Sequence, residues 1–180
     1  MAALSRLGRQ LTEVVATFNQ MGVHCALIGG LALAAHRVVR ATQDVDLLTD
    51  GRQADEIDGA LLKLGYACLH RSADAGNYLR GDERLDLLYA TRPAARRLLA
   101  GAAEVGTAFG ALHVVSAEGL IAFKLQGWVN NPRRGQDLED IRALLRANRD
   151  TLDLAEVRDF FRLFKREDLL EELLNESPEP

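Results

Sequence analysis

The sequence predicts an α/β fold in which a mixed β-sheet is packed by helices and is followed by a helical C-terminal part. Apolar residues recur at helical spacing in the first twenty positions, and short apolar runs separated by glycines follow as far as residue 115. Beyond Ser116 the apolar spacing is helical. We therefore expect an α/β core over residues 1–115 and a helical part packed on it over residues 116–180. The 48% hydrophobic content is sufficient for such a core.

The first half of the core alternates helices with strands. Glycine just after an apolar run accepts the left-handed conformation of a helix end, so Gly22 and Gly65 mark two helix C-termini. The expected elements are a helix that ends at Gly22, a strand over 23–28, a helix over 31–37, a strand over 45–48 and a helix over 52–64.

Short extended runs and then helices fill the remainder. Gly76 and Gly81 break the run from Tyr66 to Tyr89, which predicts antiparallel strands, and Pro93 suits the first turn of a helix. The expected elements are strands over 66–70, 77–80 and 84–89, a helix over 93–99, a hairpin over 103–115, helices over 116–130, 136–147, 154–164 and 167–174, and a frayed tail over 177–180.

Composition excludes several classes of protein. The net charge of −4 argues against a general nucleic-acid coat protein, which needs clustered basic residues. Cys25 and Cys68 lie in apolar surroundings without CxxC spacing, which predicts a buried, reduced pair and a cytoplasmic protein. Arg6, Arg9 and Glu13 interrupt the N-terminal helix, so it is expected to be neither a signal peptide nor a membrane span.

Two aspartates on one expected strand are the first candidate functional residues. Asp44 and Asp46 are two positions apart, so their side chains leave the same face of a strand while Val45 points into a core. Adjacent carboxylates repel unless a cation joins them. The pair predicts a site for Mg²⁺, and two such ions can hold both the attacking and the leaving oxygen of a phosphoryl transfer.

Further candidates surround this pair in the sequence. Gly29 and Gly30 lie between a strand and a helix, where a backbone without Cβ can approach a phosphate, although a tight turn explains them equally well. Asp86, flanked by apolar Leu85 and Leu87, is the best third acid. It is expected to face the first two across the sheet, to bind the ion and to help take a proton from an attacking hydroxyl.

Taken together, these motifs resemble the DNA polymerase β-like nucleotidyltransferase superfamily. The likeness covers residues 20–148 and rests on Gly29-Gly30, Asp44-Val45-Asp46 and Asp86. The amino-acid sequence of residues 29–33 and 40–46 is most similar to that of the AbiE-type toxin-like bacterial nucleotidyltransferases. The resemblance implies a nucleotidyltransferase fold and a cytoplasmic enzyme that moves a nucleoside monophosphate from an NTP to a hydroxyl acceptor and releases pyrophosphate.

The resemblance also assigns roles outside the aspartates. It implies that Lys124 offsets triphosphate charge and that Asp137 orients or pairs with nearby basic groups, while a surface lysine and helix-dipole compensation are the alternatives. Arg40 is expected to brace the Asp strand or to touch phosphates. Gln136 stands where a basic residue usually precedes the helical acid.

The identity of the acceptor stays open at this point. The toxin-type likeness implies RNA, tRNA or a protein as acceptor, and a partner antitoxin. Likeness to small antibiotic-modifying members implies an aminoglycoside or lincosamide hydroxyl instead. A noncatalytic binding module with the same fold is the rival from another class.

Overall fold

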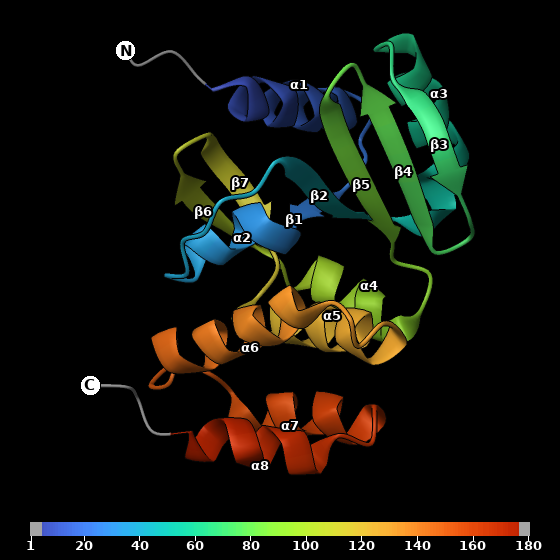
Figure 1. Cartoon of the computed structure of the whole chain (residues 1–180). Helices are drawn as coiled ribbons and strands as arrows, with labels where there is room; N and C mark the ends of the chain where they lie inside the picture. Colours follow the sequence, from blue (N-terminus) through green and yellow to red (C-terminus); the bar gives the residue numbers. More distant parts are fainter. Residues whose placement is uncertain (1–4, 177–180) are drawn as a thin grey trace. The chain divides into compact units, whose positions relative to one another are not determined.

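The computed structural model describes residues 5–176, which form two compact units (Figure 1). The first unit contains the chain up to Ala32 and Ala41–Val115. The second unit contains Leu33–Arg40 and the chain from Ser116 onward.

A seven-stranded sheet forms the centre of the first unit. Its order is β3-β4-β5-β2-β1-β7-β6. β2 pairs with β5 and β1 pairs with β7 in parallel, and the remaining neighbours are antiparallel. The prediction of a mixed sheet is confirmed. The strands are β1 (Cys25–Leu27), β2 (Asp44–Thr49), β3 (Ala67–Arg71), β4 (Ala75–Arg80), β5 (Glu83–Tyr89), β6 (Ala103–Thr107) and β7 (Gly110–Val114).

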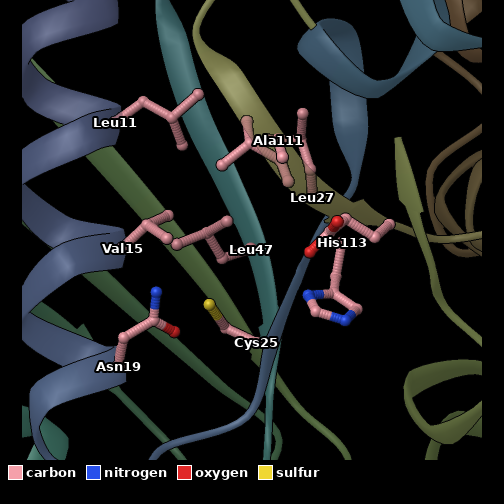
Figure 2. Close-up of a pocket in the computed structure, with 10 residues that line it drawn as sticks. Leu11, Val15, Asn19, Cys25, Leu27, Leu47, Ala111 and His113 are labelled. Carbon is pink, nitrogen blue, oxygen red and sulfur yellow. The ribbon is translucent and has the colours of Figure 1, made fainter. Parts of the chain in front are cut away.

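Helix α1 (Arg6–Gln20) covers one face of this sheet (Figure 1). Leu11, Val14 and Phe18 of α1 are fully buried, and burial of each such side chain contributes about 1.5–3 kcal/mol. Leu11 and Val15 of α1 point toward Leu47 of β2 (Figure 2). Because strand side chains alternate, the residues before and after Leu47 project from the opposite face.

Three further helices complete the described part of the first unit. Helix α3 (Ala54–Lys63), which follows a short 3₁₀ turn at Gly51–Gln53, buries Ile57 and Leu61. Helix α4 (Pro93–Ala100) begins at the expected proline. Helix α2 (Gly29–Ala35) begins at the glycine pair, and its last residues belong to the second unit.

The second unit is helical. Helix α5 (Ala117–Asn130) packs against α6 (Gly135–Ala147) and α7 (Leu154–Leu163), and α7 packs against α8 (Glu167–Asn175). The Ser116 hydroxyl caps α5 by accepting a hydrogen bond from the Gly119 amide, as the sequence predicts. The predicted tail over 177–180 lies outside the described residues.

The prediction for the cysteines is partly wrong. Cys25 is buried and Cys68 is exposed, and both are free thiols. Burial raises the pKa of the Cys25 thiol to about 11. Cys68 lies on β3, which is at the edge of the sheet and whose five residues are all exposed, so its apolar neighbours in the sequence did not indicate burial.

Across residues 5–176, no helix combines the length and the apolar character that crossing a membrane requires.

Candidate functional site

A row of three polar side chains crosses the first unit's sheet. Asp46 of β2 pairs with Asp86 of β5 in the parallel register, and Asp86 pairs with Asn77 of β4 in the antiparallel register. Residues directly opposite one another on neighbouring strands project from the same face. We call Asp46, Asp86 and Asn77 the polar row, and it lies on the face opposite α1.

Asp44 lies beside this row. It is two residues before Asp46 on β2 and therefore shares its face, and its partner in the register is Arg84 of β5. The core residues between these acids, Val45 and Leu85, are fully buried on the other face. The structure therefore brings the three predicted acids, Asp44, Asp46 and Asp86, onto one face of adjacent strands.

Asn77 holds the Asp86 carboxylate. Its Nδ2 donates a hydrogen bond of 2.6 Å to Asp86 Oδ1. Within residues 5–176, Asp86 forms no ion pair with a lysine, arginine or histidine. The amide of Asn77 thus orients the Asp86 carboxylate, and no cation pairs with this carboxylate in residues 5–176.

The glycine pair lies directly against Asp46 of the polar row and against Thr42. Gly29 has a φ of +65°, and a Cβ there would lie 2.2 Å from Asp46 Oδ2. A Cβ on Gly30 would lie 2.7 Å from Thr42 Oγ1. Both distances are far below van der Waals contact, so larger residues would displace the Asp46 carboxylate or the Thr42 side chain. The glycines are therefore required for local packing, whether or not they also approach a phosphate.

The donor set fits a divalent ion that binds together with a nucleotide. Among the residues that the structure describes, no three Asp, Glu, His or Cys side chains converge closely enough to hold a metal by themselves. Mg²⁺ in phosphate-transfer sites usually takes one or two carboxylates and completes its shell with phosphate oxygens and water. Asp46 and Asp86, at one register on adjacent strands, supply this smaller set.

A second group of charged side chains lies in the second unit. We call it the ion cluster, and it contains Arg40, Lys124, Arg134, Gln136, Asp137 and Asp140. Arg40 binds Asp140 with two hydrogen bonds, from Nε at 2.9 Å to Oδ1 and from Nη2 at 3.0 Å to Oδ2. Gln136 Nε2 donates a third bond of 3.0 Å to Asp140 Oδ1. Asp140 is almost fully buried, with 1% of its surface exposed.

Lys124 joins the two acids of the ion cluster. Its Nζ lies 3.0 Å from Asp137 Oδ1 and 2.8 Å from Asp140 Oδ2. Arg134 Nε lies 2.6 Å from Asp137 Oδ2, which is an ion-pair contact without the geometry of a hydrogen bond. Gly127 makes room for this carboxylate, because a Cβ there would lie 2.8 Å from Asp137 Oδ2. The predicted pairing of Asp137 with basic groups is present in this geometry.

The charge balance of the ion cluster stabilises ionised Asp140. Burial of the carboxylate opposes ionisation, but hydrogen bonds from Arg40 and Lys124 outweigh it and lower the pKa of Asp140 below its ordinary value. The cluster contains three cations, Arg40, Lys124 and Arg134, and two carboxylates, Asp137 and Asp140. The named side chains of the cluster therefore carry one excess positive charge.

Sequence reasoning missed Asn77. A signal for it was nevertheless present, because Gly81-Asp82 forms a tight turn in which Arg80 pairs with Glu83. Counting outward from this turn along the two strands places residue 77 opposite residue 86. The role of Arg40 was also only partly foreseen, since its partner Asp140 lies 100 positions away in the sequence.

The mixed sheet, with acids on two adjacent parallel strands, defines the chain as a protein of nucleotidyltransferase fold. Two structures of the antibiotic-resistance factor ANT(2'')-Ia match it, both at 18% identity. A solution structure has a TM-score of 0.69 and covers 94% of this chain and 97% of that chain. A crystal structure in complex with adenylyl-2''-tobramycin has a TM-score of 0.68, with coverages of 89% and 98%.

Two further solved structures have the same fold. The lincomycin-bound lincosamide antibiotic adenylyltransferase LnuA matches with a TM-score of 0.57 and 15% identity, over 79% of this chain and 98% of that chain. An antigenic nucleotidyltransferase-like protein from Paracoccidioides brasiliensis matches with a TM-score of 0.58 and 19% identity, with coverages of 96% and 95%. The predicted fold is confirmed.

The family comparison points in the same direction. The model of the aminoglycoside-2''-adenylyltransferase family matches residues 10–87, the part that contains the glycine pair and the three predicted acids. This match supports the prediction of a nucleotidyltransferase enzyme. A search of curated proteins found no match. The predicted closeness to AbiE-type proteins stays a prediction.

Proposed function

We propose that the chain is a Mg²⁺-dependent nucleotidyltransferase that transfers a nucleoside monophosphate from an NTP to a hydroxyl group of a small polyhydroxylated acceptor of the aminoglycoside class. The observation that carries this proposal is the parallel register that places Asp46 beside Asp86, with Asp44 on the same face. The match of residues 10–87 to an aminoglycoside adenylyltransferase family supports the choice of acceptor and of ATP as the donor.

The residues of the first unit have distinct roles in this reaction. Asp44 and Asp46 hold Mg²⁺, and Asp86 completes the site. When bound, the ion would supply charge neutralisation for the phosphates. Gly29 and Gly30 give a phosphate access to the backbone. Asp86 accepts the proton of the acceptor hydroxyl while the oxygen of that hydroxyl bonds to the α-phosphorus. The bond from that phosphorus to the bridging oxygen breaks, and pyrophosphate leaves.

The acidic character of the chain favours a cationic acceptor. The formal net charge is −4, and an acidic protein attracts a polyamine sugar while it repels RNA. A nucleic-acid or protein acceptor, with a partner antitoxin, is the second candidate. The sequence of residues 29–33 and 40–46 favours it, because it resembles the AbiE-type proteins. Lys124 and Arg40 are proposed in both cases to contribute positive charge toward the triphosphate.

A transfer assay with several acceptors tests the proposal. The protein is incubated with Mg²⁺ and each α-labelled NTP, in separate reactions with aminoglycosides, lincosamides, total RNA and cellular protein. We expect label from ATP on an aminoglycoside, no label after chelation of the metal, and no label with the Asp44→Asn/Asp46→Asn variant. Label on RNA or protein, together with growth arrest on expression, would favour the second candidate. No label and no nucleotide binding would contradict both and would favour a binding module.

A further inference from the structure

We infer that Asn77 is a positioning residue for Asp86, and that it fixes the direction of this carboxylate without cancelling its charge. The inference rests on the proposed nucleotidyl transfer and deepens it, because it names the residue that orients the proton acceptor. Nothing in the family match or in the sequence motifs points to Asn77. It comes from the register of β4 with β5 and from one hydrogen bond.

The hydrogen bond restricts Asp86 to one orientation. Asn77 Nδ2 donates to Asp86 Oδ1 at 2.6 Å, which is shorter than the usual N–H···O distance. Residues 5–176 form no other side-chain hydrogen bond to Asp86. The bond uses one acceptor site of Oδ1 and fixes the plane of the carboxylate, so that its remaining acceptor sites face a cation or a hydroxyl proton in one geometry.

The choice of an amide has a chemical reason. A lysine or arginine at position 77 would also orient Asp86, but its positive charge would repel a divalent ion and make the carboxylate a weaker base. An amide donates the same kind of bond and carries no net charge. Neutral donors that orient metal-binding carboxylates commonly affect metal affinity or activity by about 10–100-fold.

The strand that carries Asn77 is held firmly on both sides of it. The hydroxyl of the buried residue Tyr78 donates a 2.9 Å hydrogen bond to Asp58 Oδ1. A Cβ on Gly76 would lie 2.7 Å from the Tyr89 hydroxyl, so the backbone at Gly76 packs directly against that side chain. A donor on such a fixed strand can hold Asp86 in a single geometry.

Three variants test the inference. Asn77→Leu keeps the approximate size of the side chain and removes the donor. Asn77→His restores an N–H at nearly the same distance from the backbone. Asn19→Leu is the matched control, because Asn19 is exposed on α1, which covers the opposite face of the same sheet.

Two measurements are made on each variant: steady-state transfer kinetics, and Mn²⁺ affinity in the presence of a non-hydrolysable ATP analogue. For Asn77→Leu we expect kcat to fall about 10–100-fold with KM for ATP little changed, and Mn²⁺ affinity to fall by about tenfold. We expect Asn77→His to recover part of both losses. We expect Asn19→Leu to behave as the wild type does.

The outcomes separate the inference from the proposed function. Wild-type kinetics and Mn²⁺ affinity in Asn77→Leu, alongside an active wild-type protein, would overturn the inference and leave the proposed function intact. A rise in KM for ATP with unchanged kcat would also overturn it, because it would place Asn77 in nucleotide binding. A wild-type protein that neither transfers a nucleotide nor binds Mn²⁺ would overturn both.

Discussion

The polar row of the first unit and the ion cluster of the second unit use carboxylates in opposite ways. In the polar row, Asp86 is held by one neutral amide, Asn77, and no cation of residues 5–176 pairs with it. In the ion cluster, Asp140 is held by Arg40, Lys124 and Gln136. Asp86, a carboxylate without a cation partner, is suited to a metal ion, whereas the acids of the ion cluster have matched cations and cross-link segments of the second unit.

This contrast predicts different consequences for the two sets of acids. Removing one partner of a buried ion pair leaves an uncompensated charge and strongly destabilises a protein. Removing a carboxylate that is not compensated relieves repulsion and costs little stability. A substitution of Asp86 in the polar row should therefore act on transfer, and substitutions of the acids Asp137 and Asp140 in the ion cluster should act on folding.

The largest effect is expected for Asp86→Asn. Loss of the proposed proton acceptor and metal ligand should lower kcat by about 10²–10⁴-fold in the transfer assay. The free energy of unfolding, measured with urea, should change by less than about 1 kcal/mol, because Asp86 has no ion pair to lose. Asp82→Asn is the control, since Asp82 is an exposed acid that pairs with Arg6. Equal activity in both variants would contradict the account.

The second-largest effect, a loss of stability, is expected for Asp140→Asn. Arg40 and Lys124 would lose a shared carboxylate that is 1% exposed, and we expect the free energy of unfolding to fall by about 3–5 kcal/mol. Urea unfolding followed by circular dichroism measures this change. Asp159→Asn is the control, because its pair with Arg162 is exposed and such pairs contribute about 0–1 kcal/mol. Similar losses in the two variants would remove the distinction between the two kinds of acid.

A smaller effect is expected for Gly29→Ala. The added Cβ would meet the Asp46 carboxylate, and the φ of +65° disfavours alanine. We expect a loss of about 1–3 kcal/mol in the free energy of unfolding, together with reduced transfer because Asp46 is displaced. Gly59→Ala on α3 is the matched control, since a Cβ there meets nothing within 4 Å. The control should gain up to about 1 kcal/mol. A Gly29→Ala variant with unchanged free energy of unfolding and unchanged transfer would show that Asp46 is not held against this glycine.

The smallest effect is a pH dependence of stability. The pKa of Asp140 is lower in the folded protein than its ordinary value, so the unfolded chain takes up a proton first as the pH falls. Its stabilising contribution is complete above about pH 4 and is lost as the pH falls through the lower, native pKa. The stability difference between the wild type and Asp140→Asn should therefore shrink below pH 4. A constant difference from pH 6 to pH 3 would contradict the lowered pKa.

Local patterns were enough to predict most of the fold. The alternation around Asp44 and Asp46, the helix-ending glycines at positions 22 and 65, and the Ser116 cap each depend on neighbours within a few residues. The prediction that Asp86 faces the first acids is confirmed by the register of β2 with β5. Local signals sufficed here because strand alternation and helix capping are themselves local.

Long-range pairing could not be predicted in the same way. The bond between Arg40 and Asp140 joins positions 100 residues apart, and no local pattern at Arg40 indicates its partner. Cys68 was expected to be buried because its neighbours are apolar, yet its strand is at the edge of the sheet. The position of a strand within a sheet depends on the order of all the strands, which the residues around Cys68 do not encode.

The central claim is that the polar row binds a divalent ion together with a nucleotide. Mn²⁺ binding followed by electron paramagnetic resonance, with and without a non-hydrolysable ATP analogue, tests it most directly. We predict that the wild-type protein binds Mn²⁺ much more tightly with the analogue present, and that Asp46→Asn abolishes this enhancement while Asp159→Asn preserves it. An enhancement that survives in Asp46→Asn, or none in the wild type, would contradict the account.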